Sequence, residues 1–187
     1  LSVFRQALAW GRDYGPVCLG AACPGPFDFA KGVSHMRHKW RGLMDVPLPS
    51  VFARELPGVP VRFLHDSTAF LLGEAWQGAA RDMENPAGVM LGTGFGFTVM
   101  QRRRVLVDAN GTPAVVVWNA PFRDGTVEDY VSRRALRDAY GPQAPDVREL
   151  AELARGGDTR AQAIFRRMGE ALGEVLTRYL PAGTDGV

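Results

Sequence analysis

The sequence predicts a mixed α/β fold, and three features indicate it. Over residues 1–120, short apolar runs that end in glycine or proline alternate with segments of helical periodicity. The remaining residues are dominated by helical patterns, and no linker rich in proline, glycine and serine divides the chain. Strands and helices followed by helices alone are typical of layered α/β proteins.

The first elements are a helix and a buried strand. Apolar side chains recur at helical spacing over residues 1–14 and predict a helix that ends near Tyr14. Residues 17–22 form an apolar run stopped by Pro24-Gly25-Pro26, which predicts a strand followed by a rigid turn. Residues 27–49 show no clean period, and a segment of this length inside a compact domain is usually functional.

The middle of the chain predicts helices and a β-hairpin. Ser50 can cap a short helix that extends to residue 56, and residues 59–64 read as a strand. The strongest helical pattern covers residues 67–80, with Asp66 at the N-cap position. Strands at 88–91 and 97–100, joined by the turn Gly92-Thr93-Gly94-Phe95-Gly96, predict a hairpin.

The last third of the chain is predicted to be mostly helical. Strands are expected at 104–107 and 114–118, with the turn Asn110-Gly111 between them. Amphipathic patterns then predict four helices, at residues 126–130, 132–139, 146–155 and 159–180.

Composition excludes several classes of protein. Of the 187 residues, 46% are hydrophobic and 22% are charged, the balance of a folded globular protein rather than a disordered one. No apolar stretch approaches the roughly 20 residues that span a bilayer, so we expect no membrane association. The net charge of +2 leaves no electrostatic footprint for nucleic acid. The tight basic run Arg102-Arg103-Arg104 is expected to be a solvated hairpin tip.

The cysteines indicate a reducing compartment. Cys18 and Cys23 are too few for a disulfide framework or a four-ligand zinc site, and a cytoplasmic location fits best. We expect both to be ordinary buried thiols.

Two features in the middle of the chain could carry chemistry. Asp66 follows a strand and opens a helix, where ligands gather in open α/β sheets and where a carboxylate can accept a proton from a substrate hydroxyl. The same position suits a simple N-cap. The segment Gly92–Gly96 allows close approach of the backbone to a phosphate, although a glycine turn can also be purely structural. It matches neither the dinucleotide-binding fingerprint nor the P-loop.

Taken together, these motifs resemble the ROK family of sugar kinases and sugar-responsive regulators. The resemblance rests on P-G-P-F-D at residues 24–28, a tryptophan-containing loop that ends in V-P-L, V-R-F-L-H-D-S-T-A at 61–69, and L-G-T-G-F-G at 91–96. Further on, V-E-D-Y-V-S at 127–132 resembles the segment that follows the family's zinc motif. The resemblance implies an actin-like, hexokinase-like (ribonuclease H-like) fold of two α/β domains around a cleft.

The resemblance implies transfer of the γ-phosphoryl group of ATP to a hexose-like hydroxyl, with Mg²⁺. Asp66 matches the family's catalytic base, and Gly92, Thr93 and Gly94 match the loop that holds the ATP phosphates. Such a transfer depends on positioning, charge neutralisation and a base for the nucleophile. We expect a small-molecule sugar as substrate and a homodimer as the assembly.

The chain also departs from the family pattern. The family usually has Asn before the catalytic Asp and Asn two residues after it, where this chain has His65 and Thr68. The Glu-x-Gly-His sugar clamp is absent between Val99 and Glu128. No cysteine lies beyond Cys23, so we expect no structural zinc.

Other residues must therefore hold the sugar. The candidates are His65, Lys39, Glu128 and Asp129: His65 can bond a sugar hydroxyl, and Glu128 matches a sugar-binding Glu of the family. Lys39 lies in the loop His35-Met36-Arg37-His38-Lys39-Trp40, whose mix of cations and an aromatic ring suits sugar or phosphate. Each has a structural alternative: a histidine bonded to the backbone, a solvated basic loop, and a solvated acidic helix start.

The resemblance divides the chain at Asp66. Residues 1–65 would be the remainder of an N-terminal α/β domain, and 66–187 a C-terminal α/β domain with a helical tail. The family's first phosphate-binding hairpin and its last glycine strand have no match, so the chain is expected to be truncated at both ends. A non-catalytic sugar-sensing regulator with a DNA-binding segment is the alternative to a kinase, and only that alternative predicts a nucleic-acid partner.

Overall fold

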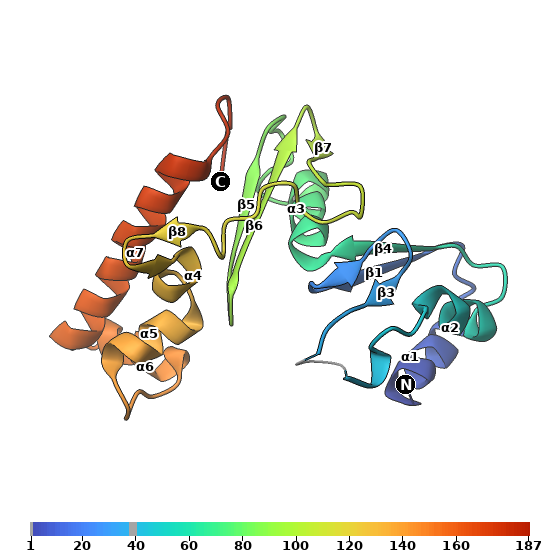
Figure 1. Ribbon diagram of the computed structural model, residues 1–187, viewed down its shortest axis with the longest axis horizontal. Coiled ribbons are helices and arrows are strands. Elements are labelled where there is room, and N and C mark those ends of the chain that lie inside the picture. Colours follow the sequence, from blue (N-terminus) through green and yellow to red (C-terminus); the bar gives the residue numbers. More distant parts are fainter. Residues whose placement is uncertain (1, 38–40) are drawn as a thin grey trace.

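The computed structural model describes residues 2–37 and 41–187, and its elements form two groups along the chain (Figure 1). The first group comprises α1 (Ser2–Arg12), β1 (Leu19–Cys23), β2 (Phe27–Asp28), β3 (Val33–Ser34), the 3-10 helix η1 (Arg41–Leu43), α2 (Leu48–Glu55) and β4 (Val61–His65). The second comprises α3 (Asp66–Gln77), β5 (Ala87–Leu91), β6 (Phe95–Gln101), β7 (Arg104–Val105), β8 (Pro121–Phe122), β9 (Gly125–Thr126), α4 (Val127–Tyr130), α5 (Arg133–Tyr140), α6 (Val147–Arg155) and α7 (Thr159–Tyr179). The mixed α/β composition agrees with the sequence.

A parallel strand pair organises the first group. β1 and β4 pair from Leu19 opposite Val61 to Cys23 opposite His65, so both strands end at the same edge. Aromatic side chains from β2, α2 and β4 pack around this pair; for example, the rings of Phe52 and Phe63 lie 5.5 Å apart. The parallel pairing therefore carries the residue after His65 to the edge of the sheet, where open α/β folds bind ligands.

An antiparallel sheet organises the middle of the chain. β6 pairs with β5 along its length and with β7 at its end. Helix α3 packs on this sheet at Gly88, where an added Cβ would lie 3.3 Å from Leu71 Cβ and from Thr98 Cγ2. Glycine at this position lets the helix approach the strand closely, so α3 packs tightly against the β5–β6 hairpin.

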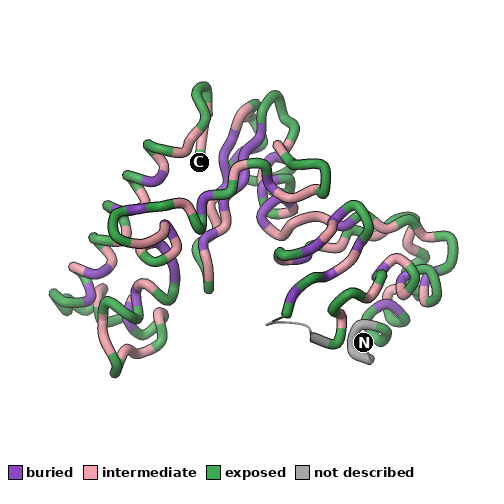
Figure 2. Tube along the Cα trace, viewed as in Figure 1, coloured by how far each residue is buried: buried purple, intermediate pink, exposed green. Residues whose placement is uncertain are grey.

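Helices α4–α7 cover the other side of the hairpin. The core between them joins strand residues of β5 and β6 to fully buried Val127 and Val175, and a smaller core around Leu150 joins α5, α6 and α7. Figure 2 shows the buried stretches along β5, β6 and the inward sides of the helices. Near the C-terminus, Asp185 accepts hydrogen bonds from the amides of Glu84 and Asn85, which fixes this end beside β5.

Several expected boundaries are corrected by the structure. The predicted cap at Ser50 is wrong, because α2 begins at Leu48 after Pro47, whose φ of −72° already suits the start of a helix. Residues 114–118 form no strand, although Ala114 donates to the carbonyl of Leu106 and Gly111 makes the expected turn at φ 82°. The remaining helices of the last third lie within one or two residues of their predicted bounds.

The expectation that both cysteines are buried is wrong for one of them. Cys23 is 4% exposed at the end of β1, whereas Cys18 precedes the strand and is exposed. Burial, with a smaller contribution from the charge of Asp66, raises the pKa of the Cys23 thiol to about 11.

The cysteines are therefore expected to differ in reactivity. At pH 8, iodoacetamide should modify Cys18 quickly and Cys23 at least tenfold more slowly, because the thiolate is the nucleophile and Cys23 is both protonated and buried. Peptide mass spectrometry after timed labelling measures both rates, and urea-unfolded protein is the control in which they should converge. Equal rates in the folded protein would contradict the burial of Cys23.

The arginine run at the β6–β7 turn is more than a solvated tip. Arg103 donates to three backbone carbonyls, those of Ala75, Arg81 and Met83, each at 2.8 Å. These acceptors lie in and just beyond α3, so Arg103 ties the end of that helix to the sheet. Sequence patterns could not identify these acceptors, because they lie 20 to 28 residues away.

Replacing Arg103 is expected to reduce stability. Arg103→Ala removes three charge-assisted hydrogen bonds and should lower the free energy of unfolding by about 1–3 kcal/mol. Urea unfolding followed by circular dichroism measures the change. Arg104→Ala, in the same run, is the control and should stay within about 0.5 kcal/mol. Equal effects of the two substitutions would show that the carbonyl contacts contribute nothing.

Candidate functional site

The junction of β4 and α3 carries three adjacent polar residues, His65, Asp66 and Ser67. The predicted N-cap role of Asp66 is wrong by one residue: His65 is the N-cap, with ψ 143°, and its Nδ1 accepts from the Ser67 amide at 3.3 Å. Asp66 opens the first turn, and its Oδ1 accepts from the same amide at 2.8 Å. The positive end of the helix dipole therefore favours the ionised carboxylate.

His65 and Asp66 form a close pair. Nδ1 of His65 lies 3.0 Å from Oδ1 of Asp66 and 2.8 Å from the Ser67 hydroxyl oxygen. With a proton on Nδ1 the ring donates to Asp66, and without one it accepts from Ser67. The opposite ring atom, Nε2, faces Gly25 in the turn after β1, at 3.7 Å from where a Cβ would stand. The Asp66 side chain keeps 43% of its surface exposed, so the carboxylate is accessible to a ligand.

The glycine turn at residues 92–94 connects β5 to β6. The Gly92 amide donates to the Gly94 carbonyl at 3.1 Å, and a Cβ added to Gly92 would meet nothing within 4 Å. A Cβ on Gly94 would collide with the carboxylate of Glu128. A side chain at 94 would therefore displace the Glu128 carboxylate from the turn, and the open side at 92 is accessible to a ligand.

Two hydrogen bonds to residues of helices α4 and α5 hold this turn in place. Oε2 of Glu128, on α4, accepts from the Phe95 amide at 3.1 Å. The amide of Arg133, the first residue of α5, donates to the Gly92 carbonyl at 2.9 Å. The structure thus brings Glu128, predicted from sequence as a sugar-binding residue, to the turn predicted to hold phosphates.

Asp129 has a different environment from its neighbour. Its Oδ2 accepts from the amide and hydroxyl of Thr126, and its Oδ1 accepts from Arg134 at 2.6 Å. The Thr126 hydroxyl, then the Thr126 amide and the charge of Arg134, lower the pKa of the Asp129 carboxyl below its usual range. These contacts form a capping box at the start of α4.

The loop after β3 lies partly outside the described residues. Lys39, with His38 and Trp40, falls in the undescribed segment 38–40, so its predicted role stays a prediction. His35 is described, and its Nδ1 lies 3.0 Å from Oδ1 of Asp45.

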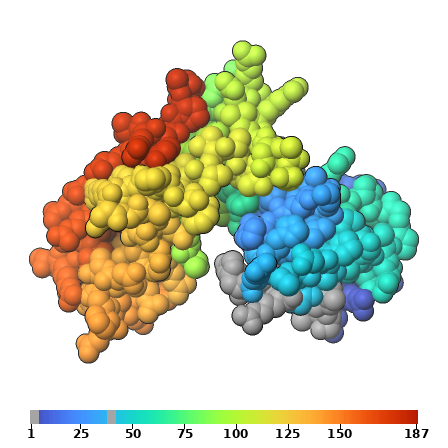
Figure 3. Space-filling model, in the orientation of Figure 1, coloured from blue at the N-terminus to red at the C-terminus, as the bar shows by residue number. Residues whose placement is uncertain are grey.

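A hollow separates the two groups of elements. Figure 3 shows it between the blue residues of the first group and the yellow and orange residues of the second, with the light green tip of the β5–β6 hairpin at its border. β1 and β4 both end on the side of the first group that faces this hairpin (Figure 1). The ends of β1 and β4 and the glycine turn thus lie on opposite sides of the hollow.

A pocket of about 740 Å³ lies between Thr93, in the glycine turn, and α5. Arg133, Arg134 and Arg137 of α5 line it together with Asp138, and none of the sequence motifs indicates Arg133 or Arg137. Their spacing of four residues after the helix cap Ser132 was the available signal, because it places two cations on one helix face.

Among residues 2–37 and 41–187, no group of three or more histidine, cysteine or acidic side chains is arranged to hold a metal ion. Within the same residues, no helix is long and apolar enough to cross a membrane.

Comparison with known proteins identifies the family of this chain. The family model described as the ROK family matches residues 11–182. This chain belongs to the ROK family. The glucokinase of Thermotoga maritima is 29% identical to this chain, and the match covers 87% of this chain and 59% of that protein.

Solved ROK structures share the fold. The glucokinase of Parabacteroides distasonis superposes with a TM-score of 0.77 at 28% identity, covering 87% of this chain and 53% of that one. The ROK hexokinase of Thermus thermophilus gives 0.73 at 27% identity, with coverages of 100% and 70%. A ROK family transcriptional regulator gives 0.73 at 17% identity, with coverages of 94% and 52%, and this likeness shows the fold alone. The chain thus spans 53–59% of the two glucokinases that it resembles.

Proposed function

We propose that this ROK chain is part of an ATP-dependent sugar kinase that transfers the γ-phosphoryl group to a hydroxyl of a hexose-like sugar. Support comes from family membership and from the similarity to a glucokinase and a hexokinase at 27–29% identity. The observation that carries the proposal is the accessible Asp66 carboxylate at the joint end of β1 and β4.

In this proposal Asp66 is the general base. It accepts the proton of the sugar hydroxyl while that oxygen forms a bond to the γ-phosphorus, and the bond from the γ-phosphorus to the β,γ-bridging oxygen breaks to release ADP. The Ser67 amide donates to Oδ1 of the carboxylate at 2.8 Å and holds it in position before the reaction. His65, 3.0 Å away, orients the same oxygen.

The glycine turn is proposed to hold the phosphates of the donor. Its open side at Gly92 and its fixed backbone suit phosphate oxygens, which bind to backbone amides. Mg²⁺ would neutralise the charge that develops on the phosphates, and it is bound largely by phosphates and water with one or two protein oxygens. The carboxylate of Asp66 and the hydroxyl of Thr93 are oxygen donors of the kind that such an ion takes.

The sugar is proposed to bind in the hollow, against His65 and Glu128. Nε2 of His65 faces the turn at Gly25, and the carboxylate of Glu128 lies at the glycine turn. Asp129 and Lys39 complete the proposed set, although the capping contacts of Asp129 support a structural role more than a ligand contact.

We further propose that residues 1–65 and 66–187 correspond to two domains. We also propose that two copies of the protein assemble as a homodimer. Separate cores support the division: one cluster of buried side chains lies within residues 8–63, and the others lie within residues 71–180.

The test is a phosphorylation assay of the full-length protein with ATP, Mg²⁺ and a panel of hexoses and N-acetylhexosamines. ADP formation that depends on one sugar supports a kinase. Sugar binding by calorimetry without any ADP formation would contradict the proposal and favour the alternative, a sugar-sensing regulator.

A further inference from the structure

The pocket between the glycine turn and α5 is distinct from the junction of β4 and α3 where Asp66 lies. Thr93 lines one end, and at the other end the chain that follows α5 contributes the uncharged residues Gly141, Pro142 and Ala144. Its volume of about 740 Å³ lies within the range of small-molecule sites. Since Thr93 belongs to the glycine turn, this pocket adjoins the turn.

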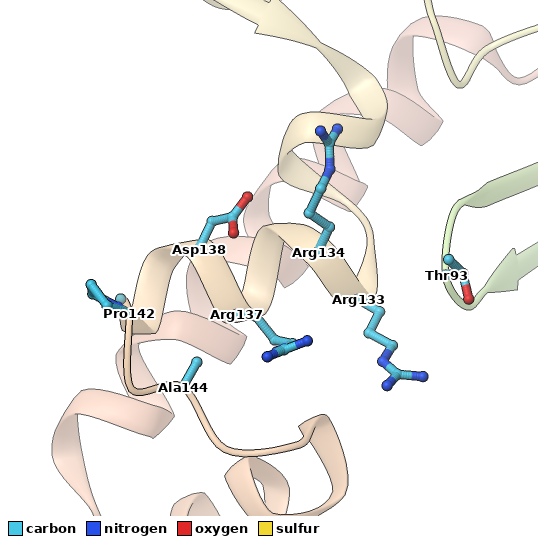
Figure 4. A pocket seen from close by; sticks show the side chains of 8 residues that line it. Thr93, Arg133, Arg134, Arg137, Asp138, Pro142 and Ala144 are labelled. Carbon is cyan, nitrogen blue, oxygen red and sulfur yellow. The ribbon is translucent and has the colours of Figure 1, made fainter. Parts of the chain in front are cut away.

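Positive charge gathers on one side of α5. Figure 4 shows Arg133 and Arg137 extending from the same side of the helix, and Arg134 and Asp138 extending from the other. Arg134 and Asp138 also line the pocket, and the charge of Arg134 is compensated by Asp129 at 2.6 Å.

Arg133 and Arg137, which extend from the same side of α5, differ in their partners. Nη2 of Arg133 lies 2.9 Å from Oδ2 of Asp146, at the start of α6, which fixes its guanidinium at the edge of the pocket. Arg137 takes part in none of the ion pairs found among the described residues. Asp138 lines the same pocket, but its side chain extends from the other side of α5 (Figure 4), so the guanidinium of Arg137 is available to an anionic ligand.

The backbone links these arginines to the turn. The amide of Arg133 donates to the Gly92 carbonyl at 2.9 Å, so the N-terminus of α5 lies against the turn. Arg137 follows one helical turn later on the same face. A chain of phosphates that begins at the glycine turn would therefore pass Arg133 and then Arg137, whose planar guanidinium groups suit bidentate contacts to phosphate oxygens.

We propose that Arg133 and Arg137 bind the polyphosphate chain of the phosphoryl donor and determine the affinity for that donor. This inference rests on the proposed kinase function, which leaves the residues beyond the glycine turn unassigned. The ligand chemistry is a linear chain of phosphates, which either a nucleoside triphosphate or inorganic polyphosphate can supply.

The test measures binding by calorimetry to the full-length protein in the presence of Mg²⁺. One arm uses the non-hydrolysable ATP analogue AMPPNP, and the other uses inorganic tripolyphosphate. The variants are Arg137→Gln and Arg133→Gln. The control is Arg155→Gln, which removes an arginine paired with Glu152 on α6, away from the pocket.

We expect Arg137→Gln to raise the dissociation constant about 10- to 100-fold, because one or two charge-assisted hydrogen bonds are lost, and Arg133→Gln to raise it in the same direction. Arg155→Gln should leave it unchanged. Weakening in the AMPPNP arm alone identifies a nucleotide as the donor, and weakening in both arms identifies the phosphate chain as the recognised group.

Unchanged binding in folded Arg137→Gln and Arg133→Gln, or no binding of either ligand by the wild type, would overturn the inference. Thermal melting of each variant establishes that it is folded. The kinase proposal fails separately: if no sugar is phosphorylated but Arg137→Gln still weakens AMPPNP, the arginine site stands without the activity. If sugar is phosphorylated and Arg137→Gln leaves the KM for ATP unchanged, the arginine site fails and the activity stands.

Discussion

Asp66→Asn is expected to lower the kcat of sugar phosphorylation by about 10²- to 10⁴-fold, the usual contribution of a general base. The amide cannot accept the hydroxyl proton, yet its oxygen can still accept from the Ser67 amide as the carboxylate does. The start of α3 should therefore be preserved, and the KM for ATP should change little. Initial rates from a coupled assay of ADP formation measure both constants.

The control for this substitution is Asp82→Asn. Asp82 lies beyond α3 with 86% of its side chain exposed, and it pairs with the exposed Arg81 at 3.4 Å. The same chemical change there should leave kcat within about twofold. If Asp66→Asn retained more than a third of the wild-type kcat, Asp66 would not be the base.

Leu150→Ala is expected to produce the largest loss of stability among single substitutions in helices α5–α7. Leu150 is 0% exposed on α6 and packs with Leu136 of α5 and with Ala161 and Ile164 of α7. Truncation leaves a cavity where three helices meet, which typically costs about 2–5 kcal/mol of unfolding free energy. Urea unfolding monitored by circular dichroism measures the loss.

Leu153→Ala provides the matched control, because Leu153 lies on the same helix with 40% of its surface exposed. It should cost less than about 1 kcal/mol, since little apolar surface is uncovered. Comparable losses for the two substitutions would mean that α6 is not anchored through Leu150.

The sequence predicts local elements well where the pattern is long and strong. The hairpin of β5 and β6 and the helix α7 were expected within a few residues of their bounds, because strand and helix periodicities are local properties. Residues 114–118 were expected to be a strand and are not, although they are apolar. The Ala114 amide donates to the Leu106 carbonyl, and Val107 forms an isolated bridge with Pro113, but this pairing does not continue as a ladder over 114–118.

The candidate site was predictable in part. Asp66 and the glycine turn follow from strand ends and glycine chemistry, which are local signals. The one-residue error at the cap arose because His65 competes with Asp66 for the Ser67 amide, and a histidine ring is not a usual cap. The bond between Glu128 and the Phe95 amide spans 33 residues, so no pattern within a short window could reveal it.

The two hydrogen bonds that hold the glycine turn have a thermodynamic consequence. Because Glu128 and Arg133 already restrain residues 92–95, the loss of conformational entropy in this segment occurs when the protein folds and not when a ligand binds. A preorganised turn gives higher affinity for the same contacts. Loss of the Glu128 carboxylate would therefore return that entropic cost to the binding step and weaken the affinity for the donor phosphates proposed to bind the turn, apart from any contact that Glu128 makes with the sugar.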